Sequence, residues 1–172
     1  MDLKDAVGLI NHNRISEKGP TTWADLGCGD GLFTNALATC LMPASKIYAV
    51  DRKPNVLNTS RIYEGVEVEN ITADFTGPLP ISNLEGILMA NSLHFVSDKQ
   101  RFLKKCSQYF KADELFLFVE YNTDTPNRWV PFPISFVSLS QLFLSLNFRN
   151  IEIIGKIPSR FHGEIYASLV SR

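Results

Sequence analysis

One acidic residue and three regularly spaced glycines mark the stretch of this sequence best suited to binding chemistry. Asp25 ends a short apolar run, and Gly27, Gly29 and Gly31 follow at every second position. A helical pattern of apolar residues begins at Leu32. The order strand, glycine turn and helix is typical of the part of an α/β fold that holds a nucleotide-like cofactor.

Four further polar residues each follow an apolar run that we predict to be a strand. They are Asp51, Asp74, Asn91 and Glu120. Ligands of open α/β sheets bind beyond the carboxyl ends of the strands, so these side chains and Asp25 are expected at one edge. Each one alone is equally well explained as a helix cap or a solvated loop residue. Together they predict a binding site at that edge.

The spacing of the glycines separates two kinds of cofactor. A dinucleotide turn has the pattern Gly-x-Gly-x-x-Gly, whereas the third glycine comes one residue earlier here. Asp25 and Asp30 flank the turn, and two carboxylates repel a pyrophosphate but suit an ammonium or sulfonium group. Asp51 stands 20 residues after Gly31, where a carboxylate can accept hydrogen bonds from a ribose diol. The pattern therefore favours an adenosyl ligand with a positive centre.

Strand-like and helical segments alternate along the chain. The predicted strands are 21–26, 46–51, 66–72, 84–90, 115–119, 148–157 and 164–170. Helices are predicted over 2–16, from Leu32 to before Pro43, from Lys53-Pro54, after a cap at Ser97 or Asp98, and after a cap at Ser138. The last two strands are joined by too short a segment for a crossover helix, so they should be antiparallel. This order predicts an α/β fold with a Rossmann-like, doubly wound, mostly parallel sheet.

Composition places the chain among ordinary globular proteins. It has 172 residues, 45% of them hydrophobic, and a net charge of −1, which predicts one domain over 1–172. The absence of a basic stripe argues against nucleic acid, and no apolar segment is long enough to predict a membrane partner. Three cysteines without metal-ligand spacing and an N-terminus without an apolar signal core suggest reduced thiols, no metal and a cytoplasmic location. The sequence does not indicate an oligomeric state.

The motif from Asp25 to Gly31, together with Asp51 and the pair Asp74-Phe75, resembles the class I S-adenosylmethionine-dependent methyltransferases. The resemblance covers nearly the whole chain. It implies a seven-stranded sheet in the order 3-2-1-4-5-7-6 with an antiparallel last strand. It also implies an enzyme that takes S-adenosylmethionine as its cofactor and methylates a small molecule by in-line displacement.

The resemblance assigns roles at the methionine end of the cofactor. Asp25 and the backbone of Gly27, Cys28 and Gly29 would hold the methionine part. Asn91 would lie close to the reactive methyl group through its carbonyl or its side chain. Cys28 is expected to matter for its small size and not for reactivity.

The same resemblance assigns four further residues to the adenosine end of the cofactor. Asp51 would accept from the ribose hydroxyls, and Arg52 would pack beside the adenine. Asp74 would accept from the adenine amine, and Phe75 would lie near the ring.

Catalysis requires a general base only if the acceptor must lose a proton during attack. The candidate catalytic residues are His94, Glu120 and His162. Each has an alternative interpretation: His94 as a buried, hydrogen-bonded histidine, Glu120 as a salt-bridge partner and His162 as part of a solvated turn.

The candidate substrate-binding residues lie in loops. They are Arg128, Trp129 and Arg160. With His162, the two arginines would converge on an anionic small molecule if both loops lie at the carboxyl edge. The alternative is that the proline-rich loop 122–135 simply packs against the sheet.

Two segments are candidate lids over the acceptor. They are the N-terminal helix within residues 1–18 and the loop 122–135. His12 and Arg14 of the first segment would then either reach the acceptor or form a solvated helix end.

Several other functions remain open or are disfavoured. Base-modifying methyltransferases carry Asn or Asp followed by Pro-Pro and an aromatic residue after the fourth strand, whereas this chain has Asn91-Ser92-Leu93-His94. A nicotinamide oxidoreductase would need the later third glycine, and no Tyr-x-x-x-Lys pair is evident. A non-catalytic binding protein with a methyltransferase fold and a protein methyltransferase both remain alternatives.

Overall fold

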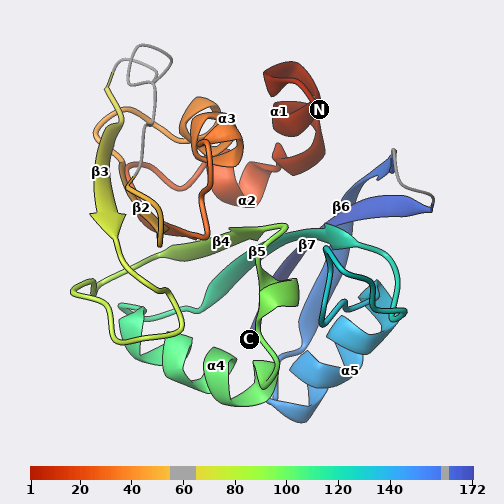
Figure 1. Ribbon diagram of the computed structural model, residues 1–172. Helices are drawn as coiled ribbons and strands as arrows, with labels where there is room; N and C mark the ends of the chain where they lie inside the picture. The colour runs from red at the N-terminus through yellow and green to blue at the C-terminus, as the bar shows by residue number, and fades with distance from the viewer. Residues whose placement is uncertain (55–64, 160–162) are drawn as a thin grey trace.

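A single seven-stranded sheet forms the centre of the molecule, in the order β3-β2-β1-β4-β5-β7-β6 (Figure 1). The computed structural model describes residues 1–54, 65–159 and 163–172. The strands are β1 (Thr22–Leu26), β2 (Lys46–Asp51), β3 (Glu67–Thr72), β4 (Gly86–Ala90), β5 (Leu115–Tyr121), β6 (Asn150–Pro158) and β7 (Glu164–Ser171). The first five strands are parallel, and β7 is antiparallel to both β5 and β6. The predicted fold class, strand order and terminal hairpin are confirmed.

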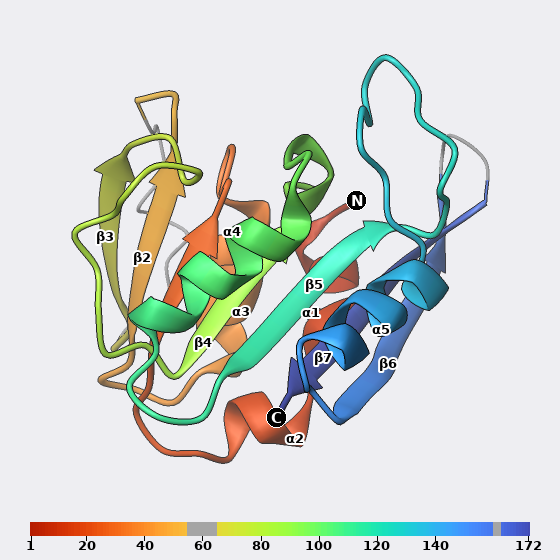
Figure 2. The same cartoon turned by 90° about the horizontal axis from the view of Figure 1, so that it is seen from below.

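Helices cover both faces of this sheet (Figures 1 and 2). They are α1 (Leu3–Ile10), α2 (Asn13–Ser16), α3 (Leu32–Cys40), η2 (Leu93–Phe95), α4 (Lys99–Cys106), η3 (Ser107–Tyr109) and α5 (Phe136–Ser145). α1 and α3 pack on one face, whereas α4 and α5 pack on the other. None of the helices within the described ranges is long and apolar enough to cross a membrane.

The apolar run in β5 explains how two cores form around one sheet. Successive strand residues point to opposite faces, so a strand that is covered on both sides is apolar at every position. Phe116 and Phe118 enter the core beneath α4 and α5, whereas Leu117 and Val119 enter the core beneath α1 and α3. β5 is therefore held from both sides, which fixes the position of Glu120 at its end.

The N-terminal segment forms two helices, so the single helix predicted over residues 2–16 is wrong. Asn11 and His12 are extended, with ψ of 119° and 143°, and they separate α1 from α2. The His12 Nδ1 accepts a hydrogen bond from the Arg14 amide at 3.3 Å and so caps the second helix. Asparagine and histidine are poor helix formers, and a side chain that bonds the local backbone favours a break.

α2 carries His12 and Arg14 to the amino edge of the sheet. The Arg14 guanidinium donates to Glu152 Oε1 at 3.2 Å and to Ser171 Oγ at 2.7 Å. Ser171 pairs with Leu115, the first residue of β5, so this edge is opposite to the carboxyl ends. Of the two alternatives given for these side chains, the position at the amino edge does not fit contact with the acceptor and fits a helix end away from it. α1 itself is packed on α3 and β6, and a lid function of residues 1–18 stays a prediction.

The other predicted helices hold with small changes. Asp98 caps α4, as expected, by accepting from the Arg101 amide at 3.0 Å. α5 is capped by Ser135 and not by Ser138, because the Ser135 hydroxyl accepts from the Ser138 amide at 3.2 Å. The helix predicted from Lys53-Pro54 lies largely outside the described residues.

Four segments gather at the carboxyl edge, which is the upper edge in Figure 2. They are the glycine turn after β1, η2 after β4, the loop after β5, and the start of β7 at Gly163 and Glu164. The candidate site is built from these segments.

Candidate functional site

The glycine turn is tied to the end of β2 by backbone hydrogen bonds. The amides of Gly27 and Cys28 both donate to the Val50 carbonyl, at 2.8 and 3.1 Å. The Gly29 amide donates to Asp51 Oδ2 at 3.0 Å. The turn and the β2 carboxylate are thus held in one fixed arrangement, and the predicted contact of Asp51 with a ribose stays a prediction.

Gly27 cannot be replaced by a larger residue without a clash. Its φ is +85°, a region that only glycine adopts readily, and a Cβ would lie 2.5 Å from the Ser92 Cβ. Ser92 is itself fixed, because its hydroxyl donates to the Leu26 carbonyl at 2.5 Å. The glycine therefore allows the β1 turn and the segment after β4 to approach each other.

A cleft of about 600 Å³ opens over this turn, and we name it the glycine-turn cleft. It is lined by Gly27, Cys28, Gly29, Asp30, Asp51, Arg52, Lys53, Pro54, Phe75, Ala90, Asn91, Ser92 and Phe95. All predicted cofactor residues except Asp25 and Asp74 are among them. The structure thus brings together residues from the ends of four neighbouring strands.

Asp25 lies fully buried beneath the cleft. Thr34 donates to its Oδ2 at 2.6 Å, whereas its Oδ1 has no hydrogen-bond partner among the described residues. Burial raises the pKa of this carboxyl to about 7, against the lowering effect of the Thr34 hydroxyl, and the nearby Asp51 raises it further. A carboxylate in this place needs a positive partner, which a ligand in the cleft can supply.

Asn91 presents a second unpartnered oxygen. Its side-chain Oδ1 is buried and has no hydrogen-bond partner in the described part of the chain, although the residue lines the cleft. Its backbone is in the left-handed region, with φ of +52°, and its amide donates to the Val119 carbonyl at 2.7 Å. The backbone of Asn91 is strained, and its hydrogen bond to β5 holds it in place. Asn91 therefore keeps a fixed position at the cleft wall.

Asp74 faces its own loop and does not line the cleft. Its Oδ1 accepts from the Thr76 hydroxyl at 2.7 Å and from the Thr76 amide at 2.9 Å, and these bonds hold its pKa below the usual range. The predicted contact of Asp74 with an adenine amine stays a prediction.

The chemistry of the cleft fits an adenosyl ligand with a cationic methionine part. The space beside Gly29 in the glycine turn is open, with nothing within 4 Å of where a Cβ would stand, and the buried oxygens of Asp25 and Asn91 lack partners among the described residues. Unpaired buried acceptors are costly, so a ligand that donates hydrogen bonds to them is stabilised.

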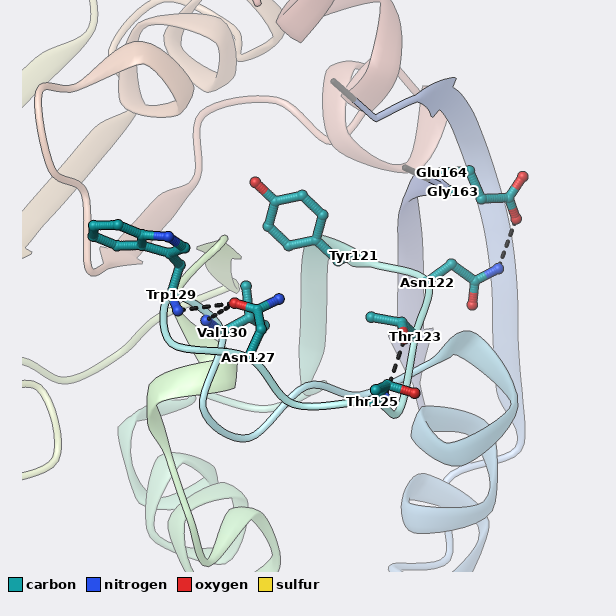
Figure 3. Close-up of a pocket in the computed structure, with 9 residues that line it drawn as sticks. All are labelled: Tyr121, Asn122, Thr123, Thr125, Asn127, Trp129, Val130, Gly163 and Glu164. Atoms are coloured by element: carbon teal, nitrogen blue, oxygen red, sulfur yellow. Dashed lines mark hydrogen bonds between the residues drawn. The ribbon is translucent and has the colours of Figure 1, made fainter. Parts of the chain in front are cut away.

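A second cavity, of about 910 Å³, lies beside the first, and we name it the loop cavity (Figure 3). It is lined by Tyr121, Asn122, Thr123, Thr125, Asn127, Trp129, Val130, Gly163 and Glu164. Trp129 was predicted, and 77% of it is exposed at the rim. The other lining residues were missed individually, because polar loop residues carry no spacing signal.

Arg128 stands next to this cavity but does not line it. Its guanidinium carbon lies 5.6 Å from the centre of the Trp129 ring. Arg160 and His162 lie outside the described residues. Convergence of these three side chains on an anion stays a prediction.

The loop that forms the cavity is anchored near both of its ends. Asp124 accepts from the Ser135 amide at 2.8 Å and from the Ser138 hydroxyl at 2.9 Å. Lys99 on α4 donates to the carbonyls of Phe132, at 2.6 Å, and Val96, at 2.9 Å. These contacts join the loop to α5 on one side and to the segment after η2 on the other.

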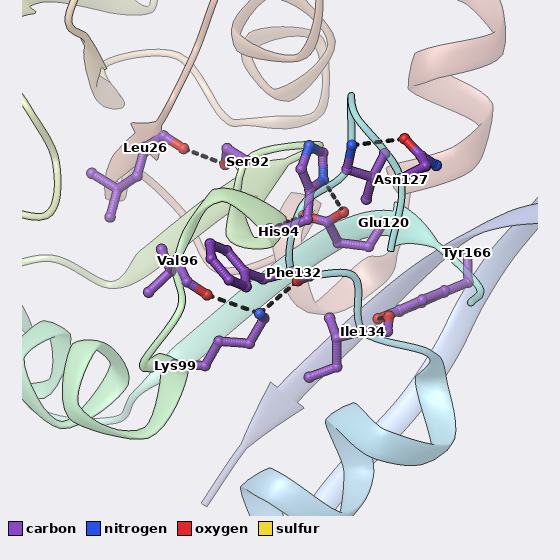
Figure 4. Close-up of polar contacts among 11 residues, drawn as sticks. Leu26, Ser92, His94, Val96, Lys99, Glu120, Asn127, Phe132, Ile134 and Tyr166 are labelled. Carbon is purple, nitrogen blue, oxygen red and sulfur yellow. Dashed lines mark hydrogen bonds and ion pairs between the residues drawn. The ribbon is translucent and has the colours of Figure 1, made fainter. Parts of the chain in front are cut away.

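His94 and Glu120 form a buried pair between the two cavities (Figure 4). The His94 Nδ1 lies 2.7 Å from Glu120 Oε2, and the His94 amide donates to Glu120 Oε1 at 3.2 Å. Neither side chain lines either cavity directly. The alternative interpretations were a buried, hydrogen-bonded histidine for His94 and a salt-bridge partner for Glu120, and both describe this one contact. A catalytic role for the two residues stays a prediction.

Comparison with known proteins agrees with this geometry. The family described as "Methyltransferase domain" matches residues 24–118, which is more than half of the chain. A search of curated proteins finds no match.

Solved structures of methyltransferases share the fold at low identity. A Burkholderia thailandensis 1,6-didemethyltoxoflavin-N1-methyltransferase, solved with its substrate and S-adenosylhomocysteine, is 18% identical with a TM-score of 0.72 over 99% of this chain and 77% of that one. An Aquifex aeolicus SAM-dependent methyltransferase is 16% identical, with a TM-score of 0.61 over 99% and 98%. The plantazolicin methyltransferase BpumL, in complex with S-adenosylhomocysteine, is 12% identical, with a TM-score of 0.66 over 99% and 83%.

Proposed function

Because the chain belongs to the family of methyltransferase domains, we propose that it methylates a small molecule held in the loop cavity. Methyltransferase activity and S-adenosylmethionine as the cofactor follow from that membership and from the fold. The small-molecule acceptor and the roles of single residues are the proposal. The observation that supports it is that the His94 ring lies 4.4 Å from the ring of Phe95, which lines the glycine-turn cleft, and 6.2 Å from the ring of Tyr121, which lines the loop cavity.

The glycine-turn cleft would hold the cofactor through fixed groups. Asp25 and Asn91 offer buried acceptors for the methionine ammonium, and Asp51 lies at the end of β2 for the ribose hydroxyls. Arg52 and Phe75 supply flat surfaces for the adenine from opposite loops. When bound, S-adenosylmethionine supplies a methyl group on an activated sulfonium, so the protein contributes mainly alignment and exclusion of water.

The loop cavity fits a small, largely apolar acceptor. Tyr121 and Trp129 offer aromatic surface, and hydroxyl and amide groups such as those of Thr125 and Asn127 offer a few hydrogen bonds. The described lining carries one charged side chain, Glu164, and it is already paired with Lys156 at 2.7 Å. A cavity of about 910 Å³ is within the range of small-molecule sites, which supports this acceptor class.

Two measurements test the proposal in sequence. Calorimetry with S-adenosylhomocysteine should show saturable binding, and its absence at millimolar ligand would contradict the cofactor assignment. The protein is then incubated with methyl-labelled S-adenosylmethionine and a cell extract that has been separated into small molecules, proteins and nucleic acids. Label should appear in the small-molecule fraction, and the Gly27→Ala variant serves as the inactive control.

The other outcomes separate the competing functions. Label confined to the protein fraction would replace the proposal with a protein methyltransferase. Cofactor binding without label in any fraction would favour a non-catalytic binding protein.

A further inference from the structure

His94 stands between the walls of the two cavities. Its ring centre lies 4.4 Å from that of Phe95, which lines the glycine-turn cleft, and 6.2 Å from that of Tyr121, which lines the loop cavity. It belongs to the short helix η2 directly after β4. The imidazole thus lies between an aromatic residue of one cavity and an aromatic residue of the other, although its own side chain lines neither.

Glu120 determines the orientation of this imidazole. Both of its carboxylate oxygens bind the same residue, one at the Nδ1 and one at the backbone amide. A carboxylate only accepts, so the Nδ1 carries a proton, and in the neutral form of the ring the lone pair is on Nε2. The His94 carbonyl is also held, because it accepts from the Phe132 amide at 3.0 Å.

The second ring nitrogen points away from Glu120 in Figure 4. Within the described ranges, nothing hydrogen-bonds it. The side chains of His94 and Glu120 are 3% and 1% exposed, so a proton taken up by the ring would create a buried cation. The adjacent carboxylate offsets that cost, which an isolated buried histidine could not do.

We propose that His94, oriented by Glu120, is the general base that takes a proton from the acceptor, and that the acceptor is a flat, largely apolar molecule with a hydroxyl or ring N–H. This inference rests on the proposed function. The flat, apolar shape follows from Tyr121 and Trp129 in the loop cavity, and the ionisable group follows from the free lone pair at the junction. Glu120 acts as a positioning residue, because both of its carboxylate oxygens bind His94 and its side chain lines neither cavity.

The proton and electron balance of the step is simple. The acceptor O–H or N–H bond breaks, its proton passes to Nε2, and its electron pair attacks the methyl carbon. The bond between that carbon and sulfur breaks, and its electron pair stays on sulfur. The imidazolium then returns the proton to water after the product leaves.

Other titratable groups surround the pair and bear on its pH response. Lys99 on α4, Tyr121 on β5 and Tyr166 on β7 each interact with the charge of Glu120. Burial raises the pKa of both tyrosines, so they do not titrate near neutrality, and burial lowers the pKa of Lys99. Asp25, with a pKa of about 7, would titrate in the same range as a histidine. A pH–rate profile alone is therefore ambiguous, and a direct readout of the imidazole is needed.

The test follows the ring nitrogens of His94 by ¹⁵N NMR in the full chain saturated with S-adenosylhomocysteine. His94→Gln identifies the signals, and Glu120→Gln removes the charge that stabilises the imidazolium. The acceptor probe is 2-naphthol, with 2-methoxynaphthalene as a probe of similar shape that has no proton to give. Ser107→Ala, which removes a hydrogen bond to Glu114 at the other end of the sheet, controls for general loss of packing.

We expect a proton on Nδ1 and a bare Nε2 near neutral pH. Adding 2-naphthol should move the Nε2 signal toward the protonated form, and adding 2-methoxynaphthalene should not. The wild type and Ser107→Ala should prefer 2-naphthol by roughly tenfold, as expected for one hydrogen bond to a charged group, and His94→Gln should lose this preference. Glu120→Gln should bind S-adenosylhomocysteine normally but lose the Nε2 response.

Two results would overturn the inference. One is a proton on Nε2 with a bare Nδ1. The other is an Nε2 signal that ignores 2-naphthol, whether or not the compound binds. Loss of S-adenosylhomocysteine binding in the wild type would instead contradict the proposed function, so the two failures are distinguishable.

Discussion

The glycine-turn cleft and the loop cavity share one edge of the sheet but are built in different ways. The cleft is made of the glycine turn and of residues that follow the ends of four strands, and Gly27 is packed so closely that a Cβ would meet Ser92. The loop cavity is made of side chains on the loop after β5, and Trp129 at its rim is 77% exposed. The cleft is therefore sensitive to a single methyl group, whereas the cavity tolerates change. A common cofactor and a variable acceptor suit this division.

The largest expected effect comes from Gly27→Ala. The variant forces an L side chain into φ of +85° and places its Cβ against Ser92, so we expect a loss of about 2–4 kcal/mol in the free energy of unfolding and no detectable S-adenosylhomocysteine binding. Denaturant unfolding and calorimetry measure the two effects. Gly8→Ala is the matched control, since nothing lies within 4 Å of its Cβ. Normal binding by Gly27→Ala would show that the close approach is not needed.

The next effect concerns the buried carboxyl beneath the cleft. The pKa of Asp25 rises from 3.8 to about 7 in the folded protein, so the folded state holds this proton more tightly than the unfolded chain. The contribution of Asp25 to the free energy of unfolding is favourable below about pH 4, and it is lost as the pH rises toward 7. Asp25→Asn should remove this fall in the free energy of unfolding, as measured by denaturant unfolding from pH 4 to 8. If the free energy of unfolding falls with pH equally in Asp25→Asn and in the wild type, Asp25 is not the cause of the fall.

Cofactor binding gives a second test of the same group. If a ligand cation pairs with Asp25, binding near pH 7 should release a proton from the wild type and none from Asp25→Asn. Calorimetry in buffers of different ionisation enthalpy measures that proton. Equal proton release by both proteins would assign it to another residue.

A smaller effect is expected from the anchor of the loop. Lys99→Met removes two hydrogen bonds to the carbonyls of Val96 and Phe132 but keeps the apolar stem of the side chain. We expect a loss of about 1–2 kcal/mol in stability, faster proteolysis in residues 122–135, and unchanged S-adenosylhomocysteine affinity. Lys104→Met, an exposed lysine on the same helix, is the control. A weaker cofactor affinity in Lys99→Met would mean that the cleft and the cavity are coupled.

The smallest effect is expected from Trp129→Ala. The side chain is largely exposed, so the free energy of unfolding should change by less than about 0.5 kcal/mol. The affinity for 2-naphthol should fall about 2- to 10-fold, as expected for the loss of one aromatic contact, while the cofactor affinity stays the same. Fluorescence and calorimetry measure these affinities. An unchanged 2-naphthol affinity would remove Trp129 from the acceptor site.

Much of the cleft was predictable because its signals are local in the sequence. The glycine turn needs left-handed backbone at fixed positions, and an acid at the end of a buried strand must lie at the carboxyl edge. Asp51 therefore lies beside Gly29 as expected. The orientation of Asp74 was not predictable, because it depends on whether its carboxylate bonds Thr76 or a ligand.

Contacts between distant segments account for what sequence reasoning missed. His94 and Glu120 are separated by 26 residues, and their pairing depends on the register of β4 against β5. The single helix predicted over residues 2–16 is interrupted at Asn11 and His12, and Arg14 lies at the amino edge of the sheet. Periodicity reports the buried face of a helix but not the edge of the sheet at which the helix ends.

The amino-acid sequence by itself determined the fold class and the position of the glycine turn at the carboxyl edge of the sheet. Strand and helix periodicities, together with a turn that only glycine fits, are properties of neighbouring residues. The tertiary structure alone decided the loop cavity, the burial of Asp25 and the pairing of His94 with Glu120. Burial, pKa and cavity shape depend on what surrounds a side chain, and in this protein those surroundings come from strands and loops far apart in the chain.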